Sequence, residues 1–163
     1  MKKFLIIDDH VVVRSGIKGL LAELYHPSIT EEAHDGESAL ACLKHNFYDL
    51  VLLDIQMPNT DALGLMEYFK IKFPDLKVLV FSMSPENIYA KRFLKAGAKG
   101  FISKDAPLQE LKTAITRVLN SGRYISTDLA ESLAMTEDQQ KDNNIFNRLS
   151  AREFEIANLL LDG

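Results

Sequence analysis

Cysteine is almost missing from this sequence of 163 residues, in which Cys42 is the single thiol. One cysteine cannot form a disulfide within the chain, so the sequence fits a reducing compartment. A lone cysteine in a helical pattern is typical of a small packed residue, and we expect no redox or metal role for it. Hydrophobic residues make up 47% of the chain, which excludes a disordered polymer and predicts an ordinary domain with an apolar core.

Long hydrophobic runs are missing as well. The first apolar run, residues 4–7, ends at Asp8 and is too short for a secretion signal or a membrane span. We therefore expect a cytoplasmic protein with no membrane partner.

The sequence also has no excess of positive charge, which nucleic-acid-binding surfaces usually carry. The formal net charge is −4. Residues 1–122 contain 15 basic and 15 acidic side chains, whereas residues 123–163 contain 4 basic and 8 acidic ones. The C-terminal part of the chain is therefore acidic, and we do not expect it to bind DNA by itself.

Short apolar runs alternate with helical patterns up to residue 122, as in a chain of βα units. Continuous apolar runs predict central strands at residues 4–7, 50–53 and 78–81, and mixed runs predict edge strands at residues 28–33 and 100–103. Helices are expected at residues 11–24, 37–45, 61–72, 85–96 and 107–120. The sequence thus predicts an α/β fold, a flavodoxin-like, doubly wound, five-stranded parallel sheet of order 2-1-3-4-5 with five helices.

The pattern changes after Gly122. We expect residues 1–122 to form the first domain, residues 123–147 to form a polar linker, and residues 148–163 to form an all-α segment. Ser150 and Glu153 form a capping box ahead of an apolar helical face. One helix cannot bury such a face by itself, so we expect the natural protein to continue beyond residue 163.

Acidic side chains follow two of the predicted strands at their carboxyl ends, where ligands bind in open parallel sheets. Asp8 and Asp9 follow the first strand, and Asp54 follows the third. Three carboxylates at one edge repel one another unless a hard divalent cation lies among them, and Mg²⁺ suits this place because it prefers oxygen ligands. The neighbouring His10 is expected to be a polar residue near a helix start, since carboxylate sites select hard cations.

Ser82 and Lys104, which follow the fourth and fifth strands, suit a phosphoryl group at this edge. Lys104 supplies a compact positive charge, and the Ser82 hydroxyl supplies a hydrogen-bond donor. No glycine-rich loop follows the first strand, so the sequence indicates no nucleotide cradle and the phosphoryl group must come from outside. Asp54, beside the cation at the end of a buried strand, is placed to accept this group as a nucleophile.

These positions are similar to those of the receiver domain of bacterial two-component response regulators. The resemblance covers residues 1–122 and rests on four segments in the family's order, Ile6-Ile7-Asp8-Asp9-His10, Leu52-Leu53-Asp54-Ile55-Gln56-Met57-Pro58, Phe81-Ser82-Met83 and Ala96-Gly97-Ala98-Lys99-Gly100-Phe101-Ile102-Ser103-Lys104. It implies a phosphoacceptor switch, able to catalyse its own phosphorylation and dephosphorylation, and not an enzyme with a separate substrate.

The resemblance implies that a sensor histidine kinase phosphorylates Asp54. Asp9, Asp54 and the Gln56 carbonyl group would hold Mg²⁺, and Asp8 would act largely through metal-bound water. Lys104 would pair with the phosphoryl group.

The resemblance also implies a conformational switch. Ser82 would move toward the phosphoryl group after transfer, and Phe101, at the position of the family's switch aromatic, would turn inward as Ser82 shifts. Gln56 and Ser84 lie where the family tunes hydrolysis of the acyl phosphate. The face near Phe101 would then change, and phosphorylation would promote a homodimer.

The segments Asp8-Asp9-His10 and Lys104-Asp105 resemble the NarL/LuxR branch of the family, which carries a helix-turn-helix domain after a linker. Residues 149–163 are similar to the first helix of that domain. The resemblance implies that the full-length protein is a DNA-binding transcription regulator. This chain lacks the turn and the recognition helix and is not expected to read DNA.

Two other functions remain open. A stand-alone receiver would act through protein contacts instead of DNA. A Mg²⁺-dependent aspartyl-phosphate phosphatase of the haloacid dehalogenase type also uses a strand-end aspartate nucleophile. That family needs an Asp-x-Asp pair after its first strand, however, and the two aspartates here are adjacent.

Overall fold

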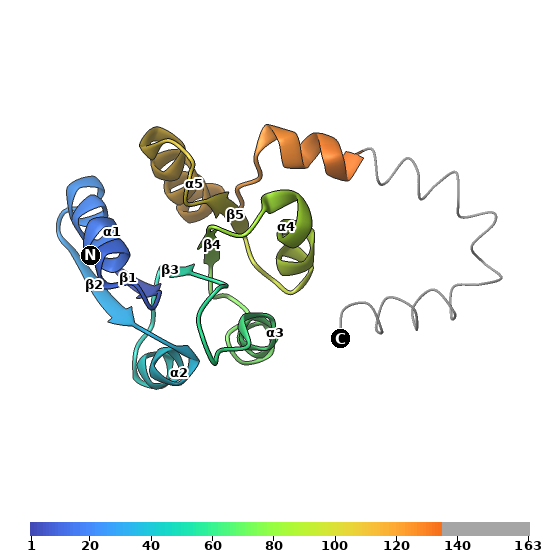
Figure 1. The fold of residues 1–163 in the computed structure, drawn as a ribbon. Helices are drawn as coiled ribbons and strands as arrows, with labels where there is room; N and C mark the ends of the chain where they lie inside the picture. The colour runs from blue at the N-terminus through green and yellow to red at the C-terminus, as the bar shows by residue number, and fades with distance from the viewer. Residues whose placement is uncertain (135–163) are drawn as a thin grey trace. The chain divides into compact units, whose positions relative to one another are not determined.

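A computed structural model describes residues 1–134 of the chain, and Met1–Ser126 form one compact unit within it (Figure 1). The strands are β1 (Lys2–Ile7), β2 (Ser28–Ala33), β3 (Leu50–Leu53), β4 (Val78–Ser82) and β5 (Gly100–Ser103). The helices are α1 (Val11–Leu24), α2 (Gly36–His45), α3 (Ala62–Lys72), α4 (Glu86–Lys95) and α5 (Leu108–Ser121). Strands and helices alternate strictly, as the sequence predicts.

The five strands form one parallel sheet of order β2-β1-β3-β4-β5, which confirms the predicted flavodoxin-like topology. The predicted central strands β1, β3 and β4 lie inside the sheet, and the two mixed runs are its edges. Each helix begins and ends within one residue of its predicted bounds. Continuous apolar runs thus indicate strands that are buried on both faces, as parallel sheets require.

Helices cover both faces of the sheet (Figure 1). Helices α1 and α5 lie on one face, where strand residues such as Phe4, Leu52 and Ile102 pack with Leu21 and Ile115 in one hydrophobic cluster. Helices α2, α3 and α4 lie on the other face. All four residues of β3 are buried, so this strand is the centre of the core.

The compact unit continues past α5. Gly122 ends this helix in the left-handed conformation, with φ of 79°, and Tyr124 then pairs with the edge of β5 at Gly100. A Cβ at Gly100 would lie 2.9 Å from the Tyr124 carbonyl oxygen, so only glycine permits this approach. Burial and a hydrogen bond to Glu110 raise the pKa of Tyr124 to about 12, so its hydroxyl stays a donor at neutral pH.

Residues 127–134 are helical and belong to a second unit, described here by itself. The predicted domain boundary at residues 147 and 148, and the predicted helix beyond it, lie outside the described residues. Among residues 1–134, no helix has the length and hydrophobicity to cross a membrane.

Lys3 of β1, Glu31 of β2 and Tyr48 form a charged cluster. The Tyr48 hydroxyl, on a side chain with 1% of its surface exposed, donates to Glu31 Oε2 at 2.7 Å. Lys3 Nζ lies 3.1 Å from Glu31 Oε1. The Tyr48 hydrogen bond, and then the Lys3 charge, hold the pKa of Glu31 below its usual value of 4.5.

Because the pKa of Glu31 is lowered on folding, the cluster stabilises the fold above the ordinary glutamate pKa and loses this effect as the pH falls through the lowered value. We expect Tyr48→Phe to reduce the free energy of unfolding by about 1 kcal/mol at neutral pH. Urea unfolding of both proteins at pH 7 and at about pH 3 measures this loss. The difference in free energy of unfolding between wild type and Tyr48→Phe should be smaller in acid. A difference of equal size at both pH values would contradict the role of Tyr48 in lowering the pKa of Glu31.

Candidate functional site

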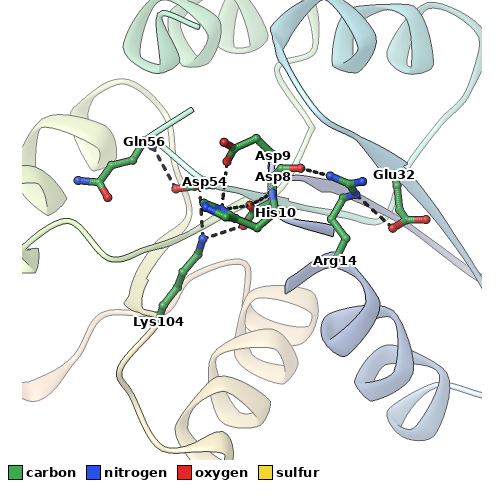
Figure 2. Close-up of polar contacts among 8 residues, drawn as sticks. All are labelled: Asp8, Asp9, His10, Arg14, Glu32, Asp54, Gln56 and Lys104. Atoms are coloured by element: carbon green, nitrogen blue, oxygen red, sulfur yellow. Dashed lines mark hydrogen bonds and ion pairs between the residues drawn. The ribbon is translucent and has the colours of Figure 1, made fainter. Parts of the chain in front are cut away.

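The carboxyl ends of the strands bring the predicted site residues together (Figure 2). Main-chain hydrogen bonds continue the sheet by one residue beyond the ends of β1, β3 and β5. Asp8 N–H donates to Ala33 C=O at 3.0 Å, Asp54 N–H to Ile7 C=O at 2.9 Å, and Lys104 N–H to Ser82 C=O at 2.9 Å. These bonds fix the backbone from which the aspartates and the lysine extend. The side chains of Asp8, Asp54 and Lys104 therefore meet because the sheet is parallel.

Two of the carboxylates are buried beside one ammonium group. Asp8 and Asp54 each expose 2% of their surface. Lys104 Nζ lies 2.8 Å from Asp8 Oδ2 and 3.4 Å from Asp54 Oδ2, and its side chain is only 10% exposed. One buried positive charge thus faces two buried carboxylates, and a buried charge without full compensation is costly.

Asp9 and His10 are more exposed than the two buried carboxylates. The Asp9 side chain is 27% exposed and the His10 ring 61% exposed. His10 Nδ1 lies 3.0 Å from Asp8 Oδ1 and 3.1 Å from Asp9 Oδ1. His10 N–H also donates to Asp8 Oδ1 at 2.9 Å.

The donor atoms fit a divalent cation. Two buried carboxylate oxygens, Asp9 Oδ1 and Asp54 Oδ2, accept no hydrogen bond within the described chain. One ligand atom each from Asp8, Asp9, His10 and Asp54 can be chosen so that all four lie within 4.8 Å of one another. Carboxylate oxygens that are buried, close together and without hydrogen bonds are suitable ligands for Mg²⁺.

The other predicted site residues lie around this group. Gln56 N–H donates to Asp54 Oδ1 at 3.0 Å, whereas the Gln56 side chain points away from Asp54 (Figure 2). Ser82 is fully buried, and its Oγ donates to Ser84 Oγ at 3.3 Å and accepts Ser84 N–H at 3.2 Å. Phe101 is also fully buried. Their roles in ligation, switching and hydrolysis stay predictions.

Arg14 belongs to this site although it was not among the residues predicted from the sequence. Its Nη1 donates to the Asp8 carbonyl oxygen at 2.6 Å, and its Nε donates to Glu32 Oε1 at 3.2 Å (Figure 2). Arg14 therefore holds the main chain of the loop that carries the aspartates. A basic residue in the first turn of a helix opposes the helix dipole, so its position is a signal that it has another partner.

Comparisons with known proteins agree with this geometry. Residues 4–116 match the response regulator receiver domain family. The chain is 36% identical to "Response regulator GacA" of Pseudomonas aeruginosa over 158 residues, which cover 96% of this chain and 74% of that protein.

Two solved structures have the same fold. A "two-component response regulator, LuxR family" from Aurantimonas sp. superimposes with a TM-score of 0.74 and 25% identity, covering 83% of this chain and 96% of that one. Response regulator TrrA from Thermotoga maritima, solved in complex with Mg(2+)-BeF, has a TM-score of 0.64 and 28% identity, covering 73% of this chain and 100% of that one. The chain therefore belongs to the response regulator receiver family, and it is a two-component response regulator of the NarL/LuxR type.

Proposed function

We propose that this chain accepts a phosphoryl group on Asp54, in a transfer that requires Mg²⁺, and that the phosphorylated form controls transcription. The observation that carries the proposal is the unequal environment of the two buried carboxylates. Both Asp8 oxygens are engaged, by His10 and by Lys104. Asp54 Oδ1 accepts one hydrogen bond, and Asp54 Oδ2 accepts none. Lys104 Nζ lies 3.4 Å from Asp54 Oδ2 but 2.8 Å from Asp8 Oδ2, so Asp54 has the less engaged oxygen of the two buried carboxylates.

Asp9, Asp54 and the Gln56 carbonyl group would hold the cation, with Asp8 acting through water. When bound, Mg²⁺ neutralises negative charge on the phosphoryl oxygens as they approach the carboxylates. Asp9 Oδ1 and Asp54 Oδ2, which accept no hydrogen bond within the described residues, support this assignment. Asp8 supports it differently, since both of its oxygens already have partners within the protein.

Asp54 Oδ2 is the nucleophile in this proposal. A bond forms between Oδ2 and phosphorus while the bond from phosphorus to the donor nitrogen breaks, and the electron pair stays on that nitrogen. Response regulators work with sensor histidine kinases, so the donor is a phosphohistidine. Lys104 Nζ, 3.4 Å from Oδ2, is close enough to pair with the transferred group.

The conformational response would begin at Ser82. Its hydroxyl is bonded to Ser84 and not to any site carboxylate, so turning toward a phosphoryl oxygen exchanges one hydrogen bond for a charge-assisted one. Phe101 would follow this movement. Gln56 and Ser84 would set how fast water reaches the acyl phosphate.

The output of the switch is transcription control by a DNA-binding domain. The likeness to a LuxR-family response regulator supports this part of the proposal. Residues 148–163, predicted to begin that domain, lie outside the described residues. A phosphorylation-dependent homodimer and a cytoplasmic location complete the proposal.

The test is the mass of the intact protein after incubation with Mg²⁺ and a small acyl-phosphate donor. We expect wild type to gain one phosphoryl group, and Asp54→Asn to gain none because its amide is not a nucleophile. Asp61→Asn is the matched control, since Asp61 caps α3 at Gly64 N–H and asparagine keeps that cap.

Chelation of Mg²⁺ should abolish the mass gain. A gain that persists in Asp54→Asn would overturn the proposal. Multiple turnover of a phosphate ester would instead favour the phosphatase.

Lys104→Met provides a second prediction, because it removes the ammonium group and keeps the aliphatic stem. In metal-free buffer the two buried carboxylates lose their shared partner, so the free energy of unfolding should fall by about 3 kcal/mol. Added Mg²⁺ should restore part of this loss. Urea unfolding measures both effects.

Lys18→Met is the control for this experiment. The Lys18 side chain is 53% exposed and lies 3.9 Å from Glu32, so its loss should change stability by less than about 0.5 kcal/mol. Equal losses for the two variants would contradict the role given to Lys104.

A further inference from the structure

Residues 122–126, which we call the strap, follow α5 and lie against β5, the last strand of the sheet. Tyr124 N–H donates to the Lys99 carbonyl oxygen at 2.9 Å, and Tyr124 pairs with Gly100. The Tyr124 hydroxyl donates to Glu110 Oε1 of α5 at 2.9 Å. Tyr124 therefore fastens the strap to β5 and α5.

Ser126 fastens the strap to a different helix. Its hydroxyl donates to Oε1 of Glu86, the first residue of α4. A hydrogen bond to a carboxylate is charge-assisted, so it is stronger than one between neutral groups. Ser126 is the last residue of the first unit, and residues 127–134 are helical directly after it. The Glu86 contact thus holds the last residue before the second unit begins.

Glu86 is joined to the candidate site by a short loop, residues 83–85, which follows Ser82 at the end of β4. Ser82 Oγ holds this loop by donating to Ser84 Oγ at 3.3 Å and accepting Ser84 N–H at 3.2 Å. Pro85, at the N-cap position of α4, makes no capping side-chain hydrogen bond. The position of Glu86 therefore depends on the hydrogen bonds of Ser82.

We propose that the strap responds to phosphorylation, because its Ser126–Glu86 contact holds in the unphosphorylated chain and weakens once Asp54 carries a phosphoryl group. The inference rests on the proposed function and adds its next step, from the site to the end of the first unit. The Tyr124 contacts come from β5 and α5 and would stay. The strap would thus loosen at its Ser126 end only.

The loosening follows from the contacts of the Ser82 hydroxyl. Once this hydroxyl turns toward a phosphoryl oxygen, it no longer donates to Ser84 Oγ or accepts Ser84 N–H. The loop then loses both of these bonds to β4, and Glu86 moves with it. A side-chain hydrogen bond is lost when its heavy atoms are about 3.6 Å apart, so a shift of about 1 Å at Glu86 is enough.

Hydrogen–deuterium exchange of the full chain tests the proposal, read on the peptide that contains the strap. The mass of the intact protein measures phosphorylation in the same samples. We expect wild type treated with Mg²⁺ and a small acyl-phosphate donor to exchange its strap amides about tenfold faster than the untreated chain. This factor corresponds to the loss of one hydrogen bond to a charged group.

Two variants remove the contact itself. Glu86→Ala deletes the acceptor and Ser126→Ala deletes the donor, so each should exchange its strap about tenfold faster without phosphorylation. Phosphorylation should then add less than about twofold. The double variant should not exceed either single variant, since both remove the same interaction.

Glu37→Ala is the matched control. Glu37 is also the acidic residue in the first turn of its helix, α2, so its loss removes the same favourable interaction with a helix dipole. The Ser126–Glu86 contact stays in place in this variant. Its strap should therefore exchange as in wild type, before and after phosphorylation.

The outcomes separate this inference from the proposed function. A wild type that gains a phosphoryl group without faster strap exchange would overturn the inference and leave the proposed function standing. An equal increase on phosphorylation in wild type and in Glu86→Ala would also overturn it, because Glu86 would then not carry the change. A wild type that gains no phosphoryl group would overturn both.

Discussion

Asp8 and Asp54 are buried side by side because β1 and β3 are neighbours in a parallel sheet and end at the same edge. Their mutual repulsion is opposed by the single ammonium group of Lys104, which arrives from the end of β5. Such a group of charges is costly to bury unless something further compensates it. The sheet therefore creates a place where the proposed cation, and then the proposed phosphoryl group, would meet side chains that are already in position.

Asp8 and Asp54 make different contacts within the site. Arg14 holds the carbonyl group of Asp8, while His10 and Lys104 hold its carboxylate oxygens. Asp8 is thereby fixed, whereas Asp54 Oδ2 accepts no hydrogen bond and lies 3.4 Å from Lys104 Nζ. Two equally buried carboxylates thus differ in how strongly neighbouring groups hold their oxygens. The same contacts bring the His10 ring to the edge where a cation would bind.

Much of this was predictable from the sequence, for physical reasons that differ between elements. Continuous apolar runs such as β3 identify central strands, and the mixed run of β2 identifies an edge, because burial alone determines both patterns. The strand-end rule then brings Asp54 and Lys104 together. It does not predict where the His10 ring turns, or that Lys104 lies closer to Asp8 than to Asp54, since side-chain directions in loops depend on local geometry.

The most direct test of the account identifies which carboxylate carries the phosphoryl group. Borohydride reduces an aspartyl phosphate to homoserine, so reduction after incubation with Mg²⁺ and an acyl-phosphate donor marks the acceptor, and peptide mass spectrometry locates it. The account predicts homoserine at position 54 and unchanged aspartate at positions 8 and 9. Homoserine at position 8 or 9 would show that Asp54 is not the nucleophile and would contradict the account.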